Sequence, residues 1–157
     1  MTKFPDSLTI RDKETLTAAP VLVYVLLAAT SGETTDAQQK AFVAILKGAD
    51  AVPSETLSVA LEHARQNYES IRSSLVGRSI DPAMEFDRVN DILLSGRLDA
   101  AEAEAFGHGL YFIADSVSKA GVKKRMFGLL GQKTSVGNRE LVNLLHRVFV
   151  EKPDQES

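Results

Sequence analysis

The 157-residue sequence predicts an all-α fold: a compact, single-domain bundle of about six to seven helices. Three observations support this. Apolar residues recur at steps of three and four along most of the chain, as they do on the buried face of a helix. Caps, prolines and glycines separate these stripes. Strand signals are almost absent, and a hydrophobic content of 44% is ordinary for a soluble globular protein.

The N-terminal part predicts a loosely ordered segment and then one apolar helix. Residues 1–16 contain mixed charge and an early proline. Thr17 is expected to cap a helix that accepts Pro20 in its first turn and runs to about Ala29. The apolar run from Ala19 is shorter than the ~20 residues that cross a membrane, so we interpret it as a buried core helix.

Two helices are expected in the next part of the chain. Thr35 and Gln38, three residues apart, predict a capping box for a helix that ends near Gly48. Pro53 and Ser54 open a third helix. Its stripe is the clearest in the sequence and consists of Leu57, Leu61, Ala64, Tyr68, Ile71 and Leu75.

Three further helices complete the predicted domain, which covers residues 17–150. Local signals give their bounds, because a cap residue precedes each helix and a glycine follows the first two. The tail at 151–157 is polar and is expected to be flexible. The boundary residues are Asp81 and Gly96 for the fourth helix, Asp99 with Glu102 and Gly121 for the fifth, and Asn138 for the last.

Two parts of the sequence resemble each other. "ETTDAQQKAFVAIL" from Glu33 aligns with "QKTSVGNRELVNLL" from Gln132, so that Thr35 matches Thr134 and Gly32 falls on Gly131. One helical hairpin used twice would explain the match by common ancestry. Shared helix physics would explain it equally, since caps and apolar stripes recur in unrelated helices.

The repeated hairpin is similar to the TerB-like helical domains associated with tellurite resistance. The segment "IADSVSKAGVKKRMFGLLGQKTSVGNRELVNLLHRVF" carries most of the resemblance, which covers about residues 22–149. It implies an all-helical, non-enzymatic interaction or scaffold module, bacterial and related to stress or to the cell envelope. The turn of that family usually carries Asp-Gly, linked to metal binding. This chain has Ser31-Gly32 and Ala120-Gly121 instead, so the resemblance implies no metal here.

Charge is distributed unevenly along the chain. Residues 1–116 carry ten Lys/Arg and seventeen Asp/Glu, a net charge of −7, whereas residues 117–157 carry eight and four, a net charge of +4. Basic residues surround apolar ones in a glycine-punctuated segment at 119–133, which suits an anionic protein or membrane surface. The alternative is that the apolar residues pack into the core. The candidate partner-binding residues are Lys123, Lys124, Arg125, Phe127, Leu130 and Lys133.

A carboxylate-based or metal-handling protein is the alternative function. Asp87 and Asp91 are one turn apart on the helix at 81–95, although Arg88 lies between them. Such a site would require Asp87, Asp91 or Asp115 to converge with Glu33 or Asp36 across helices. The turn from Thr30 to Asp36 offers two carboxylates, fewer than Ca²⁺ sites commonly use, so we interpret it as a capped connection.

Other features narrow the function further. The histidines at 63, 108 and 146 lack metal-ligand spacing, and we interpret the glycines at 107 and 109 as a close helix contact, with a ligand cleft as the alternative. We find no grouping of nucleophile, base and orienting residue, and we predict no catalytic residue and no cofactor. Few aromatics and a net charge of −3 argue against nucleic acid. The absence of cysteine suits a cytoplasmic location.

Overall fold

The computed structural model describes residues 3–31, 36–48, 52–128 and 136–151; of residues 31, 121–128 and 136 it describes the backbone alone. Helices fill most of these ranges, and no strand occurs in them. The helices are α1 (Ile10–Ser31), α2 (Asp36–Lys47), α3 (Glu55–Gln66), α4 (Tyr68–Val76), α5 (Pro82–Leu93), α6 (Ala100–Gly128) and α7 (Val136–Leu145), followed by a π-helical turn, η2 (His146–Val150).

Helix α1 begins eight residues earlier than expected, because its cap lies at Thr9 and not at Thr17. The Thr9 backbone N–H donates to Asp12 Oδ2 and the Asp12 N–H donates to Thr9 Oγ1, both at 3.0 Å, a reciprocal capping box. Pro20 is therefore inside the helix and buried. The expected loosely ordered segment is wrong for residues 10–16.

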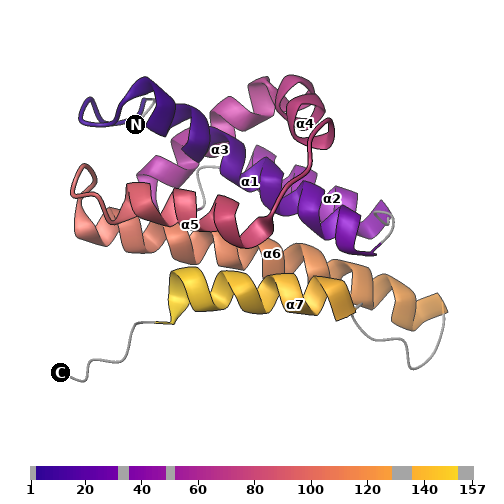
Figure 1. Ribbon diagram of the computed structural model, residues 1–157. Helices are drawn as coiled ribbons and strands as arrows, with labels where there is room; N and C mark the ends of the chain where they lie inside the picture. Colours follow the sequence, from indigo (N-terminus) through magenta and orange to yellow (C-terminus); the bar gives the residue numbers. More distant parts are fainter. Residues whose placement is uncertain (1–2, 32–35, 49–51, 129–135, 152–157) are drawn as a thin grey trace.

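Helix α1 is also the centre of the bundle. It contacts α3, α4, α5, α6 and α7, and α6 runs the length of the molecule beside it, with α7 returning antiparallel along α6 (Figure 1). From Ile10 to Thr30, α1 is long and apolar enough to cross a membrane, but half of that stretch is buried inside the bundle. The apolar run extends further than the sequence suggested, and its place in the structure is that of the expected core helix.

The predicted apolar stripes face one core. Phe42 and Leu46 of α2 are buried, as are Phe106, Leu110, Ile113 and Val117 of α6. The chain is thus an all-α bundle, as the sequence predicted. The largest aliphatic and aromatic side chains that are fully buried in this core are Leu16, Leu27, Phe42, Leu57, Leu61, Phe86, Phe106, Leu110, Ile113 and Leu145.

The long third helix expected from Ser54 to Leu75 is two helices. Ser54 caps α3 as predicted, with its Oγ accepting from the Leu57 N–H at 3.0 Å. At Asn67 the backbone leaves the helical region and the side-chain Nδ2 donates to the His63 carbonyl oxygen at 2.9 Å. A short amide side chain that competes for backbone partners in this way is a common cause of a helix end.

Two other cap assignments are wrong. Asp99 does cap α6, but the Glu102 side chain turns away from that cap and accepts from Ser54 Oγ at 2.7 Å and from the Thr56 N–H at 2.8 Å, at the start of α3. Asn138 lies inside α7, not before it, and its Oδ1 accepts from the Thr30 hydroxyl at 2.7 Å. Each side chain joins two helices where the sequence predicted a local cap.

Candidate functional site

The predicted basic segment begins as helix. Helix α6 continues through Gly121 to Gly128, so the expected helix end at Gly121 is wrong. One glycine costs a helix only about 1 kcal/mol, and Ala120 before it and the Lys-Lys-Arg run at 123–125 after it are good helix formers. Lys123, Lys124, Arg125 and Phe127 therefore lie on the last turns of α6. The candidates Leu130 and Lys133 lie outside the described residues.

The end of α6 lies where several helices meet. The C-terminus of α1, the N-termini of α2 and α7 and the last turns of α6 all lie at one end of the bundle (Figure 1). The contact between α1 and α7 is close: a Cβ at Gly137 would lie 2.6 Å from the Thr30 carbonyl oxygen. Lys119, one turn before Lys123, is 72% exposed and pairs with Asp115 at 2.9 Å, and the hydrogen bond that its ammonium donates to that carboxylate raises the pKa of Lys119.

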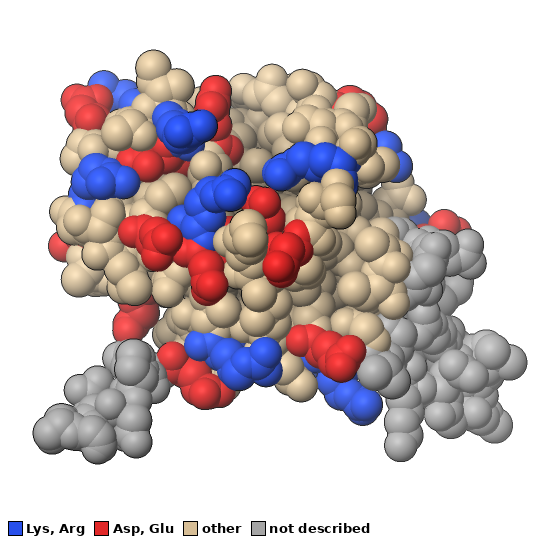
Figure 2. All heavy atoms as spheres, viewed as in Figure 1, with Lys and Arg blue, Asp and Glu red and all other residues tan. Residues whose placement is uncertain are grey.

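The described surface elsewhere is mixed in charge. On the face that carries α5 and α7, Lys and Arg side chains alternate with Asp and Glu (Figure 2). Arg65, Arg78, Arg88 and Arg97 each lie within 3.5 Å of a carboxylate. Opposite charges arranged in such pairs largely cancel, so they create little long-range electrostatic potential. The potentials of like charges on consecutive helix turns add to one another.

The acidic residues of α5 do not form a cluster. Asp81 caps the helix through the N–H groups of Ala83 and Met84, and Glu85 lies 3.4 Å from Arg78 and 3.5 Å from Arg88. Asp87 and Asp91 are exposed. Across the described ranges, no three His, Asp or Glu side chains gather as metal ligands would.

Gly107 and Gly109 of α6 are sites of close packing, as interpreted from the sequence. A Cβ at Gly107 would lie 3.0 Å from the ring of Phe149, and one at Gly109 would overlap Leu57 Cδ2. His108 between them is exposed and lines a groove of about 740 Å³ between α5, α6 and η2. His63 packs on the Phe4 ring, and His146 packs on Tyr111. The three histidines lie apart.

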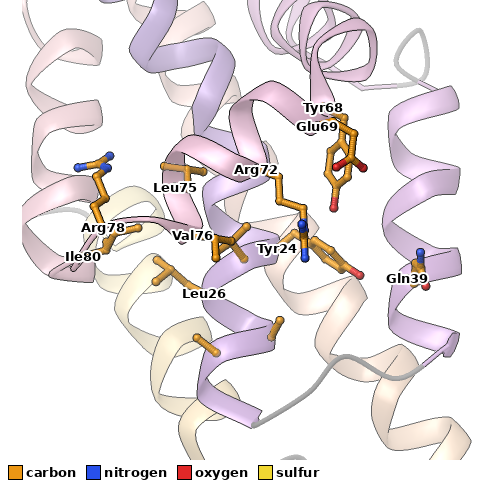
Figure 3. Close-up of a pocket in the computed structure, with 13 residues that line it drawn as sticks. Tyr24, Leu26, Gln39, Tyr68, Glu69, Arg72, Leu75, Val76, Arg78 and Ile80 are labelled. Carbon is orange, nitrogen blue, oxygen red and sulfur yellow. The ribbon is translucent and has the colours of Figure 1, made fainter.

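A second cleft, which the sequence did not indicate, lies between α1, α2 and α4. Its volume is about 680 Å³. The side chains of Tyr24, Tyr68 and Arg72 extend into the same space, and Gln39 faces them from α2 (Figure 3). The apolar part of its lining comes from Val25, Leu26, Leu75, Val76 and Ile80. We call this the α1–α4 cleft.

Aromatic packing holds the two tyrosines of the cleft. Tyr24 stacks on Phe42 with ring centroids 4.5 Å apart and an interplanar angle of 4°, and Phe42 lies 6.3 Å from Tyr68. Burial raises the pKa of the Tyr68 phenol, and the nearby Tyr24 adds to this effect. The hydroxyl of Tyr68 is therefore neutral and able to donate a hydrogen bond at physiological pH.

Comparison with known proteins adds no relative: no family model, no curated protein and no solved structure matches the chain.

Proposed function

We propose that this chain is a non-enzymatic, TerB-like interaction or scaffold module that docks an anionic partner through the basic segment at 119–133. The observation that carries the proposal is the unbroken course of α6 to Gly128. It places Lys119, Lys123, Lys124 and Arg125 on consecutive turns at one end of the bundle. A helical backbone holds these four positions at fixed spacing, so less backbone freedom is lost on binding.

Charge along the chain supports the same function. The first 116 residues have a net charge of −7, and the remaining 41 have +4. Five Lys and Arg and no Asp or Glu lie between residues 119 and 133, so this segment can orient the molecule toward an anionic surface while the acidic part of the chain is repelled. Phe127 and Leu130, within the same segment, would supply the apolar anchor that such interfaces need.

Charge reversal tests the proposal. The variant Lys123→Glu, Lys124→Glu and Arg125→Glu is compared with a control at the other end of the bundle, Lys3→Glu, Arg11→Glu and Lys13→Glu. The probes are immobilised poly-glutamate and vesicles that contain phosphatidylglycerol. We expect the wild type and the control to bind in a salt-dependent manner and the first variant to lose retention. Equal loss in both variants, or no retention of the wild type on either probe, would contradict the proposal.

Truncation of the anchor separates docking from folding. A core Phe costs about 3–5 kcal/mol when it is shortened to Ala, whereas a surface anchor costs little in the free protein. We expect Phe127→Ala or Leu130→Ala, at least one of the two, to keep the melting temperature and to weaken binding. If both variants destabilise the free domain as core truncations do, the segment is part of the architecture.

A further inference from the structure

The α1–α4 cleft combines hydrogen-bond donors and apolar surface in separate halves. Donors lie on one side, where Tyr24, Tyr68, Arg72 and Gln39 face a common space (Figure 3). The other side is aliphatic, with Val76 58% exposed at its edge, apart from Arg78, which pairs with Glu85. Concave sites of this size with a few convergent polar groups are typical of small-molecule binding.

Arg72 differs from the arginines on and around the neighbouring helices. Arg65, Arg78 and Arg88 each have a carboxylate within 3.5 Å, whereas Arg72 has none within ion-pair distance among the described residues. Its guanidinium extends toward Tyr24 and away from Glu69, which lies on the same helix (Figure 3). A guanidinium without a protein carboxylate, beside an apolar surface, favours an anionic ligand.

The phenol groups of the cleft also favour an anionic ligand, because they can donate hydrogen bonds to it. Burial raises the pKa of Tyr68, which keeps its hydroxyl protonated as a donor. With Arg72, the polar side offers one planar cationic fork and neighbouring neutral donors. The carboxylate of Glu69 also lines the cleft, beside Tyr68, but the Arg72 guanidinium extends away from it (Figure 3). One fork matches the two oxygens of a single carboxylate, and the single negative charge of that group balances the single charge of Arg72.

We propose that the α1–α4 cleft binds a small amphiphilic carboxylate, with its charged group at Arg72, Tyr68 and Tyr24 and its hydrocarbon part against Leu26, Leu75 and Val76. This site is independent of the basic segment of α6. It gives the domain a ligand whose presence alters the surface between α1, α2 and α4.

The experiment compares three ten-carbon probes of different charge on the full chain: decanoate, decanol and decylamine, each below its micelle concentration. Binding is measured by calorimetry and by tyrosine fluorescence. The chain has no Trp, and two of its three Tyr line the cleft, so binding there changes the emission. We expect saturable one-to-one binding of decanoate, at least tenfold tighter than that of decanol, and no saturable binding of decylamine.

Two variants locate the charge interaction. Arg72→Gln should weaken decanoate binding about tenfold or more and leave decanol binding unchanged. The matched control Arg65→Gln removes an exposed arginine outside the cleft, on α3, and should leave both unchanged. Both variants should keep the wild-type melting temperature within a few degrees, which shows that they fold.

A second readout is independent of affinity. Bound decanoate places a negative charge beside Tyr68, so its pKa should rise further; decanol should have little effect. Absence of saturable decanoate binding, equal affinity for decanoate and decanol, or equal losses in Arg72→Gln and Arg65→Gln would each overturn the proposal.

Discussion

The contact between Asp12 and Arg97 allows a worked prediction for the substitution Asp12→Ala. The Asp12 carboxylate accepts from Arg97 Nε at 2.8 Å, from Arg97 Nη2 at 3.2 Å and from the Thr9 N–H at 3.0 Å. It joins the start of α1 to the α5–α6 connection, 85 residues away. The substitution removes all three hydrogen bonds.

The expected loss follows from these contacts. The capping bond to Thr9 contributes about 1 kcal/mol. The Arg97 side chain is 42% exposed and regains water after the change, so we discount the charged pair to about 1–2 kcal/mol. The total is about 2–3 kcal/mol. For a chain of this size, each kcal/mol shifts the melting temperature by about 2–4 °C, so we expect a decrease of roughly 4–12 °C.

Acid titration tests the cause. Burial raises the pKa of Asp12, but the hydrogen bonds from Arg97 and Thr9, together with the Arg97 charge, outweigh it, and the net shift is downward. A carboxyl whose pKa is lower in the folded state stabilises the protein above its unfolded pKa of about 4, and this stability is lost as pH falls through the folded pKa.

Urea unfolding measured by circular dichroism should therefore show a constant difference between wild type and Asp12→Ala from pH 7 to about pH 5, and a shrinking one below about pH 4. Asp12→Asn, which retains one acceptor oxygen, should lose less. If the difference at pH 7 is absent, or persists unchanged at the lowest pH at which both proteins fold, the ion pair is not its source.

Three further predictions concern other contacts. Glu102→Ala should cost about 1–3 kcal/mol in urea unfolding, because the buried Thr56 N–H loses its acceptor, while Glu102→Gln should cost less; equal stabilities would contradict this. Gly137→Ala should lower the melting temperature despite a helix gain of about 1 kcal/mol, since its methyl would lie 2.6 Å from the Thr30 carbonyl oxygen; a stabilised variant would refute the close approach. Tyr68→Phe should remove a phenol that titrates above pH ~10 in an alkaline absorbance titration, and loss of a transition at or below pH ~10 would argue against its burial.

The sequence predicted helix boundaries correctly where the residue that sets the boundary bonds to its near neighbours in the chain. Asp81 caps α5 as expected, because a cap needs only the N–H groups two and three residues ahead. Prediction failed where the partner is distant. Glu102 has capping-box spacing, yet it bonds Ser54 and Thr56 about fifty residues earlier, and no pattern within one helix reveals such a partner.

The two candidate sites also differ in how far apart their residues lie in the sequence, and therefore in how well the sequence could predict them. The basic residues at 123–125 are adjacent in sequence, so their clustering was visible at once, although their helical state was not. The α1–α4 cleft joins Tyr24 to residues more than forty positions away. Only the four-residue spacing of Tyr68 and Arg72 could have indicated that they share a helix face, and nothing in that spacing points to Tyr24.

The glycines on α6 have a mechanical consequence. Gly107 is in contact with η2 and Gly109 with α3, so two different partners press on the same helix within one turn. If α6 rotated about its axis, a side chain would take the place of the glycine backbone at the contact with η2 and at the contact with α3, and both contacts would clash. A force applied at the Gly128 end would therefore bend or shift the helix without turning it, and the direction in which α6 presents its last turns is fixed by contacts about twenty residues away.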